Sequence, residues 1–308
     1  MVYACPCTTR AAGNFAFYRE NDGPSVQGSD RHYTSGVELL YAFQPDWVLL
    51  EQWSDLPGLS GSDRRTAAVF LLGQRINTPD HVDKPSIRDE KDWRFSGHLY
   101  IGAALQRATD RAFEQVVLNV GIIGPAAQAD DTQTWVHRVM GAPQPEGWEN
   151  QLDDEATVDL TWQRKTRWRD GSLSLGAFSR DYDVIPHTGL TVGTVNRRLN
   201  AGLLMRLGTH LPRDVGPGRV GEPQDFTLPS AKPQRGHYLF VRTDGYVVEH
   251  NRYLEGLTER PLVGQLQVGL MLLYDHWQIS LSHLVKTLEF EGQNSIDTHG
   301  ALTVNYQY

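Results

Sequence analysis

The chain has little cysteine, no surplus of positive charge and no long apolar run, and each of these absences excludes a class of protein. Its two cysteines, Cys5 and Cys7, are separated by a single proline. That spacing would strain a disulfide between them, so we interpret the pair as incidental or as part of a leader remnant, and not as a metal site. The formal net charge of −8 argues against a global basic surface, so nucleic acid is not an expected partner.

The sequence also lacks a run of about 18 apolar residues, so no transmembrane helix is expected. Its first residues show no basic region followed by an apolar core, so we expect no complete secretory signal here. Residues 1–14 are interpreted as disordered or as a leader remnant. A transmembrane β-strand needs only about 9–11 residues, of which every second one is apolar. The negative mean hydropathy therefore leaves a membrane β-barrel open.

What the sequence does contain is a series of strand-like segments at hairpin spacing. The segments are 15–22, 37–43, 66–76, 95–106, 113–123, 157–167, 183–195, 201–208, 237–247, 262–274, 278–291 and 300–308. Residues 44–64 are expected to form a polar turn region and residues 211–234 an irregular loop. Without a βαβ rhythm, this pattern predicts an antiparallel all-β protein. A soluble sandwich and a lipocalin-like barrel compete with a membrane barrel, which the long strands, the alternation of long loops with short turns and the terminal Tyr308 favour.

One polar helix is expected within residues 121–151, directly after the fifth strand. Gln133 and His137 are one helical turn apart, so they would share a face. The helix would begin near one of three residues that are good N-caps and end at Gly141, ahead of Pro143. The three are Asp130, Asp131 and Thr132. Because a histidine titrates near neutral pH, His137 is a candidate catalytic base, although an ordinary surface histidine would look the same.

Oxygen-bearing side chains gather at the ends of the first two expected strands. Asn21 and Asp22 end the first strand and Thr34 precedes the second, so a hairpin would bring the three together. Calcium prefers such oxygen ligands, although Asn21-Asp22 before a Gly-Pro pair is also typical of a plain turn. Lys84 lies in a highly charged loop, where it could aim at an oxyanion or simply be solvated.

Several short motifs occur together in the order and spacing of a known family. They are Glu20-Asn21-Asp22, Asp30 with Tyr33-Thr34 and Gly36, Asp92 with Phe95-Ser96-Gly97, Gly121-Ile122-Ile123-Gly124-Pro125, Gln133, His137-Arg138, Gly141, Gly147-Trp148, Asn150-Gln151 and the loop 206–216. In these motifs the chain resembles the outer-membrane lipid A 3-O-deacylase family. The resemblance runs from about residue 15 to the end.

The resemblance implies a single domain over residues 15–308. This domain would be a twelve-stranded antiparallel transmembrane β-barrel in the bacterial outer membrane, with a short helix in an extracellular loop. It implies calcium-dependent hydrolysis of the ester that holds the 3′-acyloxyacyl chain on lipid A of lipopolysaccharide, by a monomer. The site would lie between the barrel wall and the loop helix.

Carried over by position, the resemblance also implies residue roles. His137 would be the general base, Lys84 the cation that stabilises the oxyanion, and Gln133 the helix residue one turn before the base. Asn21, Asp22 and Thr34 would hold calcium. Arg138 and Tyr33 would contact substrate.

The chain departs from the family pattern at a few positions. At least one family member has a glutamate in the metal region six residues after the histidine, where this chain has Pro143. Glu146 or Glu149 could take its place. The arginine that can follow the lysine is Pro85 here, and the arginine before the fourth strand, Arg94, is displaced by one residue. A barrel with a transport or structural role, or a soluble barrel that binds an apolar ligand, remains an alternative.

Overall fold

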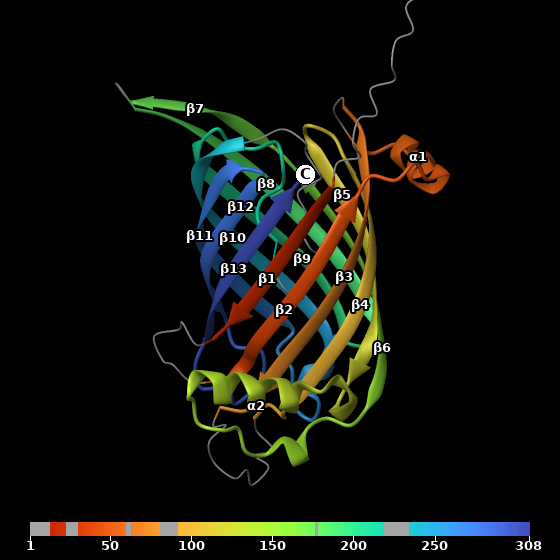
Figure 1. Cartoon of the computed structure of the whole chain (residues 1–308), viewed down its shortest axis with the longest axis vertical. Helices are drawn as coiled ribbons and strands as arrows, with labels where there is room; N and C mark the ends of the chain where they lie inside the picture. Colours follow the sequence, from red (N-terminus) through yellow and green to blue (C-terminus); the bar gives the residue numbers. More distant parts are fainter. Residues whose placement is uncertain (1–12, 23–29, 60–62, 81–91, 176–177, 219–233) are drawn as a thin grey trace, which may run out of the picture.

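The strands of this computed structural model form one antiparallel sheet that closes on itself (Figure 1). The structure describes residues 13–22, 30–59, 63–80, 92–175, 178–218 and 234–308. The strands are β1 Gly13–Asn21, β2 His32–Phe43, β3 Arg65–Thr78, β4 Ser96–Ala108, β5 Ala112–Ile123, β6 Glu155–Thr166, β7 Arg169–Leu175, β8 Phe178–Gly193, β9 Asn196–Thr209, β10 Gln234–Asn251, β11 Leu262–Asp275, β12 Trp277–Lys286 and β13 Asp297–Gln307. The helices are α1 Val48–Asp55 and α2 Ala129–Met140, with 3-10 turns η1 Pro125–Ala127, η2 Trp148–Asn150 and η3 Arg252–Leu254.

The closed sheet is a barrel with twelve positions in its wall. Strand β1 pairs with β13, and β6 pairs with β8, which closes the ring. Strand β7 continues the line of β6 after Arg167 and Trp168 and pairs with the first part of β8. The two therefore act as one interrupted wall strand, and the expected twelve-stranded barrel is confirmed.

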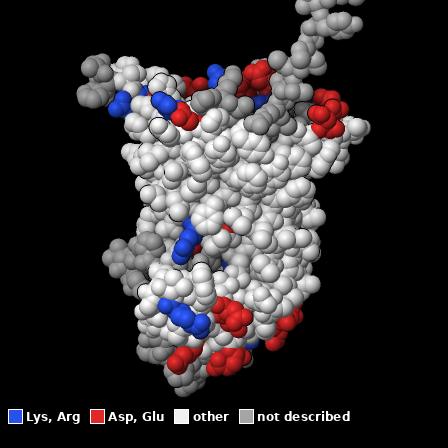
Figure 2. Space-filling model, viewed as in Figure 1, with Lys and Arg blue, Asp and Glu red and all other residues white. Residues whose placement is uncertain are grey.

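Alternation along the strands separates a polar interior from an apolar exterior. On β4, Tyr100 is 3% exposed and points inward, whereas its neighbour Ile101 is 64% exposed on the outside. Inside, Gln106, Gln115 and Gln163 of three adjacent strands form a ladder of amide hydrogen bonds of 3.1 Å each. Figure 2 shows the outer consequence, a broad uncharged band between two charged ends, interrupted by one small charged spot. This polar interior is why the mean hydropathy is negative in spite of an apolar wall.

The two ends of the barrel differ, and we name them by what they carry. Helix α2 lies at the helix end, drawn at the bottom of Figure 1, and the start of β1 and the end of β13 lie at the opposite end, which we call the termini end. Near the termini end, the backbone N–H and C=O of Gly13 and Tyr308 pair at 3.1 and 3.0 Å. None of the described helices is both long and apolar enough to cross a bilayer.

The expected polar turn at residues 44–64 is wrong in part, because it contains α1. Leu50 and Ser54 of this helix are buried. The sequence does not show this packing, since only one short face of the helix is covered. The strands also run further than expected. For example, β10 has 18 residues, because a strand that projects beyond the bilayer needs no apolar outer face there.

A chain segment after β9 enters the lumen at the termini end. Arg206 of β9, which is buried, donates to the carbonyl oxygen of Pro212 at 3.0 Å, and Arg242 of β10 donates to that of Pro217 at 2.8 Å. Val215 packs against an inner cluster of residues from three further strands, namely Ala67, Ala108 and Phe113. Residues 211–218 thus contact wall strands around the barrel and occupy this mouth of the lumen.

Candidate active site

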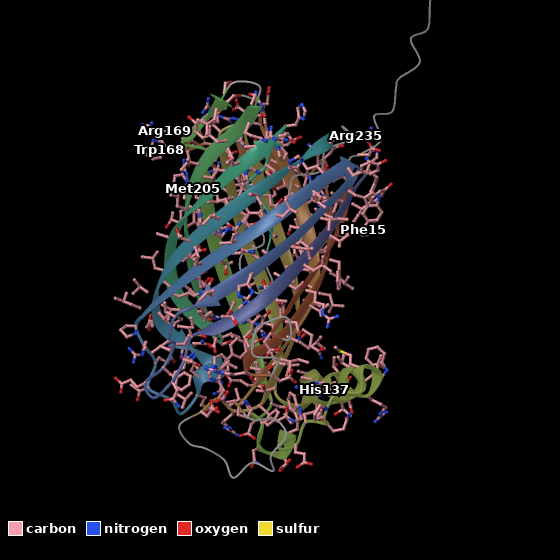
Figure 3. The ribbon with its side chains drawn as sticks, turned by 90° about the vertical axis from the view of Figure 1, so that its left-hand side faces the viewer. Phe15, His137, Trp168, Arg169, Met205 and Arg235 are labelled. Atoms are coloured by element: carbon pink, nitrogen blue, oxygen red, sulfur yellow. The ribbon has the colours of Figure 1, made fainter. Side chains whose placement is uncertain are left out.

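Helix α2 lies against the outside of the barrel wall, where Gly97 of β4 permits a close approach. A Cβ atom on Gly97 would come within 2.4 Å of the Cβ of Ala129, so any larger residue would push the helix away. Ile76, Phe95 and Trp148 pack with Ala129 into a small apolar cluster beside this contact. Figure 3 shows α2 beside the lower end of the barrel, with His137 labelled on it. The site built on α2 is therefore on the lipid side of the wall and not in the lumen.

The ends of α2 are set by left-handed backbone positions. The helix is preceded by Gln128 at φ 53°, so the expected start at Asp130, Asp131 or Thr132 is wrong by a few residues. The chain enters from η1, whose carbonyl at Ala127 accepts from Gln74 Nε2 at 2.8 Å, and this places the helix start against β3. The expected end is confirmed, since Gly141 has φ 70° and its backbone N–H bonds to the carbonyl of His137.

Asp30, in the connection between β1 and β2, joins two side chains of α2. Its Oδ2 atom lies 2.6 Å from Gln133 Nε2 and 2.8 Å from His137 Nε2. Trp148 donates its indole N–H to Gln133 Oε1 at 2.9 Å, so the amide nitrogen of Gln133 must face Asp30. The predicted shared face of Gln133 and His137 is thereby turned toward the ends of the first two strands.

The second ring nitrogen of His137 is held by the backbone. Its Nδ1 lies 2.5 Å from the carbonyl oxygen of Pro143, which can only accept a hydrogen bond. Nδ1 therefore carries a proton, and Nε2 is the nitrogen that can take or release one. Pro143, where a family glutamate can stand, thus contributes its carbonyl to the orientation of the histidine.

Asn21, Asp22 and Thr34 come together at the adjacent ends of β1 and β2, as predicted for a hairpin. The carbonyl oxygen of Thr34 accepts from Asn21 Nδ2 at 3.1 Å and from the backbone N–H of Asp22 at 3.2 Å. The Thr34 hydroxyl lies 2.7 Å from that of Thr78 on β3. These bonds hold three oxygen-bearing side chains beside the Asp30 connection.

Asp22 is a buried carboxyl group whose ionised form its surroundings only partly stabilise. Its Oδ2 accepts the backbone N–H of Arg31 at 2.5 Å, while its Oδ1 is buried and has no hydrogen-bond partner among the residues that the structure describes. Burial raises the pKa of the Asp22 carboxyl to about 8, and repulsion from Asp30 adds to the rise. An unsatisfied buried carboxylate oxygen beside a second carboxylate is what a cation would stabilise.

The side chains near Asp22 fit a hard cation that is bound by few carboxylates of the protein and by more neutral oxygens. Glu146 and Glu149, the possible substitutes at the departed position, are both exposed. Within the described residues, no group of three or more histidine, cysteine, aspartate or glutamate side chains could hold a metal. Asp22 with the neutral oxygens beside it could hold calcium, which accepts carbonyl, amide and water oxygens as readily as carboxylates.

The connection that carries Asp30 is fixed by a buried histidine that the sequence did not single out. The ring of His32 lies between two carboxylates, with its Nδ1 2.8 Å from Asp297 Oδ1 and its Nε2 3.2 Å from Asp92 Oδ1. It also stacks on Trp93, with ring centroids 5.6 Å apart. His32 thus anchors the start of β2, two residues after Asp30.

Three of the predicted site residues lie outside this group. The ring of Tyr33 lies on the lumen side, under the Arg75 guanidinium at 4.7 Å and 5.0 Å from the His299 ring. Arg138 is exposed on α2. Lys84 falls outside the described residues. The substrate contacts of Tyr33 and Arg138 and the oxyanion role of Lys84 stay predictions.

Sequence reasoning gave no role to Asp30, although Asp30 is one of the motif residues. The available signal was a lone carboxylate three residues before Tyr33-Thr34. Its contact with Gln133 spans 103 positions of the chain, so local spacing could not reveal it.

A family model described as the outer membrane protein LpxR matches residues 1–308. The chain belongs to the LpxR family. This match confirms the resemblance to outer-membrane lipid A deacylases drawn from the motifs, and it places the protein in the bacterial outer membrane. The alternative of a soluble barrel is wrong. No curated protein matches the chain significantly.

The chain is also similar to solved barrels. LpxR from Salmonella typhimurium has a TM-score of 0.75 and 19% sequence identity, over 95% of this chain and 99% of that one. The β domain of the Bordetella autotransporter BrkA has a TM-score of 0.45 and 10% identity, over 97% of this chain and 99% of that one. The first likeness supports the LpxR-type barrel fold, and the second is too distant to inform the fold.

Proposed function

We propose that this LpxR-family protein is a lipid A 3-O-deacylase that hydrolyses the ester of the 3′-acyloxyacyl chain of lipopolysaccharide and acts as a monomer. The observation that carries the proposal is the place of the Asp30–His137 pair, between α2 and the outer face of the wall. A titratable pair on that side is reached by a molecule that lies in the membrane. A water-soluble substrate would instead favour a site in the lumen or on a loop.

The orientation of the barrel supports a substrate in the outer leaflet. Bacterial barrels have longer loops on the extracellular side and shorter turns on the periplasmic side. The longest connection between wall strands, 124–154, lies at the helix end, together with 79–95; the termini end has the short turns 109–111 and 276 but also the longer connections 44–64 and 210–233. We place α2, which lies on this longest connection, on the exterior side of the membrane, where lipopolysaccharide lies.

The chain's own groups suit hydrolysis of an ester by water. Nε2 of His137 holds a proton in its direct contact with the Asp30 carboxylate; once that proton is released, the ring keeps its Nδ1 proton directed at Pro143 and Nε2 can act as the base. A water that replaces the direct contact between Nε2 and Asp30 would be oriented by the carboxylate and would lose a proton to the ring. Asp30 then stabilises the imidazolium that forms, and Gln133 keeps Asp30 in place. Proton return from His137 to the leaving alkoxide completes the reaction.

Calcium, when bound, would polarise the ester carbonyl and stabilise the oxyanion. Asp22 would hold it through the unpartnered Oδ1, together with oxygens of Asn21 and Thr34. Lys84 is proposed for the same oxyanion on the resemblance alone.

The barrel lumen does not favour a transport role. Residues 211–218 contact strands around the termini-end mouth through Arg206, Arg242 and the Val215 cluster. A transporter would need this segment to leave its buried contacts.

The test is the mass of lipid A from a Gram-negative host that expresses the protein. Wild type with calcium should lower the mass of lipid A by one acyloxyacyl unit, and His137→Ala should abolish the loss. Asp131→Ala, on the exposed side of the same helix, is the matched control and should behave as wild type. An unchanged lipid A with wild-type protein would refute the proposed activity, and full activity of His137→Ala would refute the base.

A further inference from the structure

Helix α1 lies on the outside of the barrel wall at the termini end (Figure 1). Its C-terminal end contacts an ion pair of the wall. Arg107 and Glu114 occupy outward positions of β4 and β5 and pair with an Nε–Oε2 distance of 2.7 Å. Arg107 Nη1 also donates to the carbonyl oxygens of Trp53 and Leu56, at 2.7 and 2.9 Å. Its guanidinium lies 5.3 Å from the centre of the Trp53 ring. The end of α1 is thereby attached to the lipid-facing side of the wall.

The Arg107 level marks the edge of the apolar band. Outward side chains of β4 run Ile101, Ala103, Leu105 and then Arg107 toward the termini end. On β5 the outward side chains change in the same way, from Leu118 to Glu114. A change from apolar to charged side chains on the outer face occurs where the bilayer core ends. Helix α1 therefore lies at the level of the lipid headgroups.

The face of α1 that points away from the wall carries exposed apolar side chains on either side of the exposed Gln52. Val48, Leu49 and Leu56 are 65%, 59% and 52% exposed, while Leu50 on the other side is buried. The helix carries its exposed carboxylates, Glu51 and Asp55, along a separate stripe. Such an amphipathic helix is typical of elements that lie in a membrane surface.

The apolar face of α1 continues the lipid-facing wall through a row of aromatic rings. Trp47, directly before α1, contacts Phe43 of β2 with ring centroids 5.8 Å apart. Phe43 in turn stacks on Tyr41 at 5.3 Å and on Phe70 of β3 at 5.8 Å. Aromatic rows of this kind mark the membrane–water interface of barrels. The established lipid contact of the wall thus runs without a break onto the helix.

We propose that α1 is an interfacial helix whose Val48, Leu49 and Leu56 side chains insert into the phospholipid leaflet on the termini side. It widens the lipid contact of the barrel over β3 to β5 and excludes water from the Arg107–Glu114 pair. This role goes beyond the proposed deacylation and does not depend on it, because α1 and the Asp30–His137 pair lie at opposite ends of the barrel.

The test is the environment of a fluorophore on α1 in the full chain, reconstituted in vesicles of phosphatidylethanolamine and phosphatidylglycerol. Val48→Cys and the matched control Glu51→Cys are made with Cys5→Ser and Cys7→Ser and labelled with bimane. Ile101→Cys, in the middle of the outer wall, gives the reference for deep lipid contact. The quenchers are phospholipids with a doxyl group either near the headgroup or near the chain end.

The label at position 48 should have blue-shifted emission and should be quenched several-fold more strongly by the shallow doxyl lipid than by the deep one. The label at position 51 should show little quenching by either lipid, and the label at position 101 should prefer the deep one. Equal, weak quenching at positions 48 and 51 would overturn the proposal. So would a label at position 48 that is shielded from water but not quenched by lipid, because a second copy or another protein would then cover α1.

Discussion

At the scale of single residues, Asp30 connects the two halves of the candidate site. It binds His137 and Gln133 through one oxygen and lies close enough to Asp22 to influence its ionisation. The i, i+4 spacing of Gln133 and His137 could be predicted from the sequence, as could the hairpin that gathers Asn21, Asp22 and Thr34. The link between them could not, since it depends on how α2 is seated on the barrel.

The Asp30–His137 contact predicts a graded loss of activity. His137→Ala should lower deacylation by about 10²–10⁴-fold, because it removes the proton acceptor. Asp30→Asn keeps the size but cannot stabilise the imidazolium, so the fall should be smaller, on the order of 10–100-fold. Release of fatty acid from purified lipid A in detergent measures both. A double variant should lose little more than His137→Ala, and fully additive losses would show that Asp30 acts elsewhere.

The raised pKa of Asp22 predicts how stability responds to pH. In the folded, metal-free state this pKa is about 8, whereas an unfolded aspartate has about 3.9. Between these values the folded protein keeps a proton that the unfolded chain releases. Its stability should therefore fall as pH rises from about 4 to about 8, by an amount on the order of a few kcal/mol, and then level off.

The midpoint of denaturant unfolding in detergent with EDTA, measured across this pH range, tests the Asp22 assignment. Asp22→Asn should remove most of the slope. Calcium should flatten the slope in the wild type, because a bound cation favours the ionised carboxylate. A slope that persists unchanged in Asp22→Asn would assign it to other groups.

At the scale of secondary structure, α2 depends on one residue of the wall. A Cβ on Gly97 would clash with Ala129 at 2.4 Å, while one on Gly245 would meet only a carbonyl oxygen at 3.9 Å. Gly97→Ala should therefore displace α2 and lower deacylation strongly, with a cost of about 1–3 kcal/mol for the overpacked contact. The matched control Gly245→Ala should leave both unchanged. Activity assays measure the loss of deacylation, and the temperature of the heat-induced gel shift measures the loss of stability. A fully active Gly97→Ala would mean that the position of α2 does not depend on its close contact with Gly97.

The elements that sequence reasoning missed share one physical property. Helix α1 and strand β7 lie where the barrel wall leaves the bilayer; α1 has no alternation with a period of two, and β7 alternates only over residues 172–175. Helix α1 buries only Leu50 and Ser54, and β7 repeats the pairing of a strand that had already been counted. By contrast, the wall strands could be predicted because each must present lipid with one apolar face.

At the scale of the whole molecule, the outer and inner faces of the barrel wall have different roles. The outer face carries α2 at one end and α1 at the other, both packed on the wall. The inner face carries the ladder of glutamine amides and buried ion pairs such as Arg206–Asp183. The family match accounts for the barrel, while α1 and residues 211–218 are held in place by the side chains of Arg107, Arg206 and Arg242.

The segment 211–218 predicts that the barrel does not conduct ions. Arg206, with no exposed side-chain surface, bonds the Asp183 carboxylate at 2.6 and 2.9 Å and also binds Asp214 and the carbonyl of Pro212. Because removal of one partner of a buried ion pair costs about 3–5 kcal/mol, Asp214→Ala should loosen the segment. Wild-type protein in a planar bilayer should show no steady current, and Asp214→Ala should show openings. Arg213→Ala, at the exposed neighbouring position, should stay silent. A steady wild-type current would show that the segment does not close the mouth, and a silent Asp214→Ala would show that the Arg206–Asp214 contact does not hold it there.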